Sequence, residues 1–259
     1  MISVVSHARP MMALSRPHRR NCRQFVDGSY SEGGRGRYIL HPEFAKHPDK
    51  YIRAFLLIQK DLQTLFDYVE PADGNLQTHS FRIHEMLVRT SIEVEANCKA
   101  ILRENGYTRA GDWNMSDYKK INRSHRLSSF KAKVPYWTGQ QDVREPFLNW
   151  RDDKALPWYS AYNNTKHDRF ENFEVANFGH LIDAICGLAI ILASQFMAED
   201  FGPTDGSISL EGPDTGFEEA IGNYFRISYP NDWPDEEKYD FDWNTLEIES
   251  NPFRNIEFG

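Results

Sequence analysis

The residues between Tyr162 and Arg169 combine the side-chain types that acid–base chemistry at a phosphate group requires. They are an imidazole, two amides, a phenol, two cations and a carboxylate, in the order Tyr162-Asn163-Asn164-Thr165-Lys166-His167-Asp168-Arg169. A histidine gives or takes a proton near neutral pH, and a neighbouring lysine or arginine can hold an anion. Because Asn163 and His167 are four residues apart, their side chains share one face of a helix.

These residues supply what phosphodiester cleavage needs. His167 would activate a ribose 2′-hydroxyl or protonate the leaving 5′-oxygen, and Lys166 and Arg169 would stabilise the charged phosphorane. A structural interpretation is equally available: His167 and Asp168 would cap the junction between two helices while Lys166 and Arg169 face solvent. Spacing alone does not decide between the two interpretations.

A second candidate surface is the basic stretch 118–134. Its cations include Lys119, Lys120, Arg123 and Arg126, and aromatic residues follow at Phe130, Tyr136 and Trp137. Single-stranded nucleic acid binds to such mixtures, with phosphates on cations and bases on rings. The stretch could instead be an exposed loop that balances the acidic C-terminal region. A third possibility is that the acidic tail lies on this basic loop and masks it.

The charge distribution restricts the classes of partner. The formal net charge of −8 argues against a protein that coats nucleic acid non-specifically. Residues 199–259 are rich in Asp and Glu and hold only Arg226, Lys238 and Arg254 as cations. A local basic patch, and not the total charge, decides whether an anion can dock. The acidic, aromatic-rich region 224–258 is a candidate surface for a protein partner.

Neither a metal, a cofactor nor a membrane is expected. The sequence contains none of the common metal, nucleotide or hydrolase motifs: HExxH, CxxC, a Gly-rich phosphate loop or GxSxG. His79 and His84 are five residues apart and so lack the i, i+4 spacing of the HExxH zinc site. Three dispersed cysteines (Cys22, Cys98 and Cys186) fit a reducing compartment such as the cytoplasm. The longest apolar run, Leu181 to Met197, is interrupted by Asp183 and Gln195 and is shorter than the roughly 20 residues that span a bilayer.

Apolar periodicity predicts a mainly α fold. Helices are expected at about 50–69, at about 78–104, from Pro157 or Trp158 onward, and at about 171–199. The last is apolar nearly all round, so it should be the central helix. Three regions are expected: a basic flexible arm at 1–37, a helical bundle at 38–202 and an acidic extension at 203–259.

Two parts of this layout are expected to be less regular. The bundle carries a long ordered loop insertion at 107–150, with a short strand near 130–136. The C-terminal extension alternates at 225–229, 239–243 and 246–249, which predicts either a small β appendage or an extended acidic tail packed on the bundle.

The order of these features resembles the HEPN superfamily. Glu93 and Lys99 lie on a mid-chain helix, and Tyr-Asn-x-x-Lys-His-x-Arg at 162–169 precedes a long apolar helix. Asn163 matches the polar position of the family signature and His167 matches its histidine. Tyr162 stands where the family places arginine, and Arg169 lies two residues past the histidine. The resemblance covers about residues 50–200.

The resemblance implies a HEPN-like helical bundle and a metal-independent endoribonuclease, of the kind found in toxin–antitoxin and phage-defence systems. It implies a homodimer with two His167 sites across one cleft, where His167 is the general acid or base and Asn163 orients the imidazole or the substrate. Lys166 and Arg169 would hold the phosphate of an RNA, and Glu93 would position one of these cations. Contacts to the RNA are expected from Tyr162, Lys119, Lys120, Arg123 and Arg126.

The competing hypothesis keeps the scaffold and removes the chemistry. The chain would be a non-enzymatic HEPN-like interaction protein that binds a protein or nucleic-acid partner, with residues 162–169 as structural polar contacts. Tyr162 in the arginine position favours this hypothesis.

Overall fold

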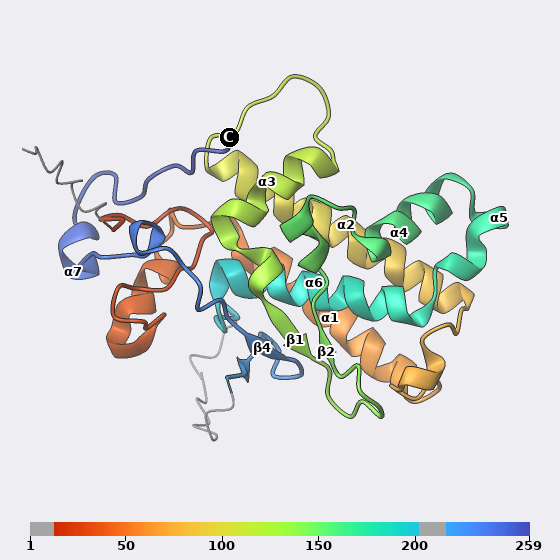
Figure 1. The fold of residues 1–259 in the computed structure, drawn as a ribbon. Coiled ribbons are helices and arrows are strands. Elements are labelled where there is room, and N and C mark those ends of the chain that lie inside the picture. Colours follow the sequence, from red (N-terminus) through yellow and green to blue (C-terminus); the bar gives the residue numbers. More distant parts are fainter. Residues whose placement is uncertain (1–12, 202–215) are drawn as a thin grey trace, which may run out of the picture.

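Helices form most of the regular structure in the computed structural model, which describes residues 13–201 and 216–259 (Figure 1). The α-helices are α1 (Pro48–Phe66), α2 (Phe81–Glu104), α3 (Met115–His125), α4 (Pro157–His167), α5 (Arg169–Asn172), α6 (Phe178–Phe196) and α7 (Trp243–Leu246). The strands are β1 (Lys131–Lys133), β2 (Val143–Arg144), β3 (Glu218–Glu219) and β4 (Arg226–Ser228). Short 3₁₀ segments include Glu32–Leu40, Leu148–Asp152 and Phe173–Val175. The predicted mainly α fold class is confirmed.

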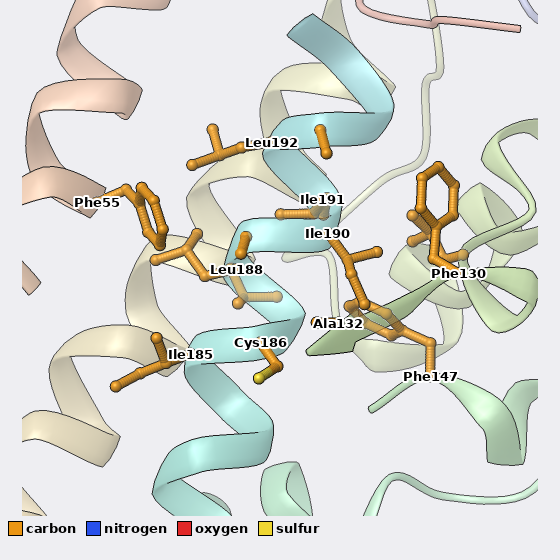
Figure 2. Close-up of a cluster of buried hydrophobic side chains, with 14 of the residues drawn as sticks. Phe55, Phe130, Ala132, Phe147, Ile185, Cys186, Leu188, Ile190, Ile191 and Leu192 are labelled. Carbon is orange, nitrogen blue, oxygen red and sulfur yellow. The ribbon is translucent and has the colours of Figure 1, made fainter. Parts of the chain in front are cut away.

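Helix α6 is the centre of the molecule, as its uniform apolarity predicts. It contacts α1, α2, α4 and β1, and every residue from Leu181 to Phe196 except Asp183 is buried (Figure 1). Figure 2 shows Phe55 of α1 on one side of α6 and Phe130, Ala132 and Phe147 on another. Since the 107–150 region supplies three of these four side chains, it forms part of the core.

The apolar helix is shorter than predicted. The sequence predicts its start near residue 171, whereas α6 begins at Phe178, where the Asn177 side chain accepts a hydrogen bond from the His180 amide. Residues 169–175 instead form α5 and a 3₁₀ turn. By length and composition α6 could cross a membrane, but 89% of its apolar window is buried inside the protein. It therefore occupies the position of a core helix.

The 107–150 region contains a helix where a loop was expected. A capping box starts α3: the Asn114 side chain accepts from the Ser116 amide, and the Asp117 carboxylate accepts from the Asn114 amide at 2.8 Å. Tyr118 and Ile121 anchor the helix in the core. The short strand expected near 130–136 is present as β1.

The described part of the C-terminal region packs on the bundle, as the second of the two alternatives describes. Strand β4, within the predicted 225–229, pairs antiparallel with β1, in a sheet of order β2-β1-β4-β3. The strands expected at 239–243 and 246–249 are wrong: Asp242 caps the short helix α7, and Tyr239 forms isolated bridges with Leu14 and Phe25. The predicted extension begins at 203, and its first residues, up to 215, lie outside the described residues.

The flexible basic arm predicted at 1–37 is contradicted at residues 17–25, most of which are buried, and residues 1–12 lie outside the described part. Arg20 is fully buried, with its Nε 2.8 Å from the Glu104 carboxylate. Its guanidinium donates to Gln195 Oε1 at 2.9 Å and to the Lys46 carbonyl at 2.6 Å. The basic composition suggested a solvated arm, but partners distant in the sequence neutralise this arginine.

Candidate functional site

Helix α4 positions the predicted residues, and it begins where the sequence predicts, at Pro157. Pro157 occupies its first turn, and the buried Trp158 indole donates to the Pro146 carbonyl at 3.0 Å. The helix ends at His167. Asp168 then caps α5, because its carboxylate accepts from the Glu171 amide at 3.2 Å. The Asp168 part of the structural interpretation is therefore present in the molecule.

His167 is open to solvent at the end of α4. Its ring takes part in no hydrogen bond or ion pair with any residue in 13–201 or 216–259, and the half-exposed Asn163 lies one turn earlier. Lys166, beside it, is also exposed. The free carbonyls of the last turn carry partial negative charge, which favours cationic side chains here. A ligand can reach the imidazole without any rearrangement of the core.

Arg169, the first residue of α5, lies against the start of α2. Its guanidinium carbon is 5.8 Å from the centroid of Phe81. Nearby, burial lowers the pKa of His84, and the positive charge of Arg169 lowers it further. The buried His84 Nε2 has no hydrogen-bond partner among the described residues. A second imidazole therefore lies near the site, on α2.

A polar seam joins α4 to α2 around Glu95. The Tyr159 hydroxyl donates to Glu95 Oε1 at 2.9 Å, and Lys99 Nζ lies 3.8 Å from the same carboxylate. Tyr162, in the position of the family arginine, is buried, and burial raises the pKa of its phenol. Lys166 Nζ is 5.3 Å from the centre of the Tyr162 ring, and its hydrogen bond with the phenol raises the pKa of Lys166.

The carboxylate of this seam is therefore Glu95 and not Glu93. Glu93 lies half-buried on α2, where burial raises its carboxyl pKa and the nearby Arg89 opposes that rise. In the described parts of the chain its carboxylate forms no ion pair with Lys166 or Arg169. The expectation that Glu93 positions one of these cations is not met by the contacts.

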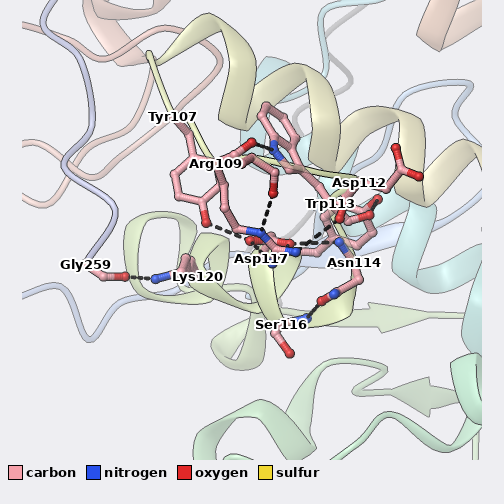
Figure 3. A network of polar contacts seen from close by, with 11 residues as sticks. Tyr107, Arg109, Asp112, Trp113, Asn114, Ser116, Asp117, Lys120 and Gly259 are labelled. Atoms are coloured by element: carbon pink, nitrogen blue, oxygen red, sulfur yellow. Dashed lines mark hydrogen bonds and ion pairs between the residues drawn. The ribbon is translucent and has the colours of Figure 1, made fainter.

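The basic residues expected to contact RNA lie on α3 or, for Arg126, directly after it, and most have intramolecular partners. Lys119 pairs with Asp153, and Arg126 pairs with Asp232 at 2.8 Å. The C-terminal end of the chain lies beside α3, and Lys120 donates to the Gly259 backbone oxygen (Figures 1 and 3). Arg123 is exposed next to Gly259. The C-terminal region thus lies on the basic segment, as the masking alternative describes.

The aromatic residues near this basic surface do not form a stacking platform. Phe130 is buried against α6, and the Trp137 indole donates to Asp73 Oδ1 at 2.7 Å while its ring stacks on Phe178. Tyr136 is exposed. Only this last ring is free to stack on a base, so the surface lacks the interleaving that single-strand binding uses.

Sequence reasoning missed Glu95 and Tyr159, and it considered His84 only as a metal ligand. A signal was present for α2: His84 and Glu95 are eleven residues apart, which is close to three helical turns and places both on one face. That face meets α4 and the start of α5. Within residues 13–201 and 216–259, no group of three or more His, Cys, Asp or Glu side chains could hold a metal ion.

Comparisons with known proteins gave no match to a family model, a curated protein or a solved structure. The chemistry of the site is therefore the basis on which a function is assigned.

Proposed function

We propose that the protein is a HEPN-like, metal-independent endoribonuclease of the cytoplasm, of the kind used in toxin or phage-defence systems, with His167 as its general acid or base. The observation that carries this proposal is the state of His167. It is exposed, its ring has no partner among the described residues, and it follows Asn163 by one turn of α4. Lys166 flanks it on the same exposed helix end.

The proposed reaction needs only proton transfer and charge stabilisation. His167 takes the proton of the ribose 2′-hydroxyl while the 2′-oxygen attacks phosphorus, and the bond from phosphorus to the 5′-oxygen breaks. The leaving 5′-oxygen takes a proton from imidazolium or solvent, which leaves a 2′,3′-cyclic phosphate and a 5′-hydroxyl. Lys166 would hold the phosphate oxygens, and Asn163 would orient the ring or the RNA.

Exposed aromatic side chains next to the site support the homodimer part of the proposal. Phe170 is 90% exposed, and Phe81, over which Arg169 lies, is 69% exposed. Contiguous exposed apolar surface is typical of protein–protein contacts. A second copy on this end of the molecule would bring two His167 sites close together.

The test compares cleavage of one RNA and of its 2′-O-methyl counterpart by the purified protein, with and without a chelator. The proposal predicts that the RNA is cut, that the 2′-O-methyl strand is intact, and that the chelator has no effect. His167→Ala should abolish cleavage and leave the helical circular dichroism signal unchanged. Uncut RNA, or equal cutting by the wild type and His167→Ala, would reject the proposal.

A matched control is available at His47, another exposed histidine. His47 adopts φ of 52°, which asparagine tolerates well, so His47→Asn removes an imidazole at little structural cost. This variant should cut RNA at the wild-type rate. Loss of cutting in both variants would indicate that the His167 effect is not specific to the site.

One observation favours the second candidate, a non-enzymatic HEPN-like interaction protein. Tyr162 is buried and hydrogen-bonded where the family has arginine, and α3 already has intramolecular partners for most of its cations. In that case the protein would bind a protein partner, or it would bind RNA without cleaving it. Binding without cleavage, unchanged in His167→Ala, would decide for this candidate.

A further inference from the structure

An arginine-lined hollow lies between the N-terminal segment and the residues that follow α7. Helix α7 lies at the opposite end of the molecule from α4 and α5 (Figure 1). The volume of the hollow is about 770 Å³. Arg16 and Arg19 line it from the N-terminal segment, and residues 249–255, which follow α7, line the other side. Small-molecule sites commonly measure about 300–1,000 Å³, so the space suits a small ligand.

The two segments that form this hollow are held together by buried contacts. The Arg254 amide donates to the Pro17 carbonyl at 2.9 Å, and the His18 Nδ1 lies 2.8 Å from the Arg254 carbonyl. His18 is itself buried. The backbone around Arg254 is therefore fixed on the neutral His18 ring, whichever side chain position 254 carries.

The three guanidinium groups in the hollow differ in their partners. Arg16 pairs with Glu249, the single acid of the lining, and donates to the Asn251 carbonyl at 2.5 Å. Arg19 lies 5.5 Å from the Phe253 ring centre, donates to Asn255 Oδ1 at 3.2 Å, and meets a carboxylate only at 4.0 Å, on Glu43.

Arg254 is the least neutralised of the three. Its side chain is 58% exposed and its nearest carboxylate, on Glu257, is 3.9 Å away and almost fully solvated. Exposed ion pairs of this length contribute little stabilisation, so the Arg254 charge is only weakly compensated. In a chain of formal charge −8, the hollow is therefore a local concentration of positive charge.

We propose that this hollow binds a small ligand that carries two or more phosphate groups. Each of the three guanidinium groups carries paired N–H donors, which can bind two oxygens of one phosphate. Ser250 and Asn251 in the lining add uncharged hydrogen-bond donors. The lining is mostly polar, which favours a hydrophilic ligand over an apolar one. A chain of phosphates meets successive guanidinium groups, whereas a single phosphate meets only one or two.

The test measures binding of inorganic triphosphate by isothermal titration calorimetry at low ionic strength, with sulfate as the simple-anion comparison. Triphosphate should bind at least about 10-fold more tightly than sulfate, since it contacts several guanidinium groups at once. Arg254→Gln should weaken triphosphate binding by about 10-fold or more, because one charge-assisted contact is lost. Arg254→Lys keeps the positive charge but lacks the paired N–H donors of a guanidinium group. Its affinity for triphosphate should lie between those of the wild type and Arg254→Gln.

Arg53→Gln is the matched control. It removes an exposed arginine of α1 that has no ion pair in the described part of the chain, so it changes net charge equally. The proposal predicts wild-type affinity for this variant. Equal affinity for sulfate and triphosphate, or equal weakening by Arg53→Gln and Arg254→Gln, would overturn it. A parallel titration with a nucleoside triphosphate separates the sources: equal affinity indicates that phosphates alone are recognised, and tighter binding indicates contacts to the nucleoside as well.

Discussion

The N-terminal segment and the end of α4 use the same residue types for opposite purposes. Arg20 of the N-terminal segment is buried, and His125 at the end of α3 has both ring nitrogens engaged, Nδ1 with the Ser124 hydroxyl and Nε2 with the Arg20 carbonyl, each at 2.8 Å. Where α4 ends and α5 begins, the side chains of His167 and Arg169 are exposed and make no hydrogen bond to a described residue. Buried side chains that make hydrogen bonds stabilise the fold, while exposed side chains without hydrogen bonds remain available to a ligand.

The difference is visible in protonation. Burial lowers the pKa of His125 to about 3, so this ring does not exchange a proton near neutral pH. Burial and the nearby Arg23 likewise lower the pKa of His18 to about 3. Neither buried histidine is a candidate acid or base, although each is as chemically suitable in the sequence as His167. Three measurements test this difference between buried and exposed polar groups.

The largest expected effect on stability is the loss of Arg20. Arg20→Met removes a buried cation from Glu104 and Gln195 and leaves the Glu104 carboxylate unpaired. Breaking a buried pair from one side typically costs about 3–5 kcal/mol of unfolding free energy, which urea unfolding monitored by circular dichroism would measure. Arg53→Met on the solvent face of α1 should change it by less than about 0.5 kcal/mol. Similar losses in both variants would mean that the N-terminal segment is not anchored by Arg20.

A pH dependence of stability should follow from the two buried histidines. Both have a folded pKa of about 3, below the usual value of 6.5, so the unfolded chain binds the extra protons first. Their contribution is fully present above the unfolded pKa and falls by about 1.4 kcal/mol per histidine for each pH unit below it, down to the folded pKa. Urea midpoints measured from about pH 7.5 down to about pH 5 would show this fall.

His125→Asn provides the control for that slope. The variant should be less stable at neutral pH because the hydrogen bonds to Ser124 and Arg20 change. The free energy of unfolding of this variant should also fall less steeply as the pH is lowered, because only one of the two buried histidines remains to take up a proton. A wild-type stability that stays constant over the whole range would contradict the buried, neutral state of both rings.

The smallest expected effect concerns the basic surface of α3. Asp232→Asn releases Arg126, so single-stranded RNA should bind about 2- to 3-fold more tightly at low salt, and the gain should vanish as salt rises. Fluorescence anisotropy with a labelled RNA measures this change. Asp235→Asn makes the same change of charge at an exposed site that pairs with Lys238. If both variants gain affinity equally, total charge and not the release of Arg126 is responsible.

The helices were predictable where a long apolar period specifies them. Helices α1 and α2 and the core position of α6 follow from repeats of three and four residues, and Pro157 marks the start of α4. Helix α3 was missed because its anchor in the core rests on few apolar side chains, chiefly Tyr118 and Ile121. The burial of residues 17–25 could not be foreseen, since the partners of Arg20 lie far along the chain at Glu104 and Gln195.

The candidate site was predictable in its local part only. The spacing of four places Asn163 and His167 on one face of α4, and the structure has both on that helix. The choice between Glu93 and Glu95 was not available from the sequence, because two residues on a helix differ by about 200° in direction and only the packing of α2 on α4 selects one. The spacing in the sequence determines which residues share a helix face, but tertiary packing determines which helix contacts that face.

The central claim is that the exposed imidazole of His167 does the chemistry. The most direct measurement is the single-turnover rate constant for cutting one defined RNA, compared between the wild type, His167→Ala and His47→Asn at equal helical content. Loss of a general acid or base predicts a drop of about 100-fold or more for His167→Ala and no change for His47→Asn. Equal rate constants for the wild type and His167→Ala would contradict the claim.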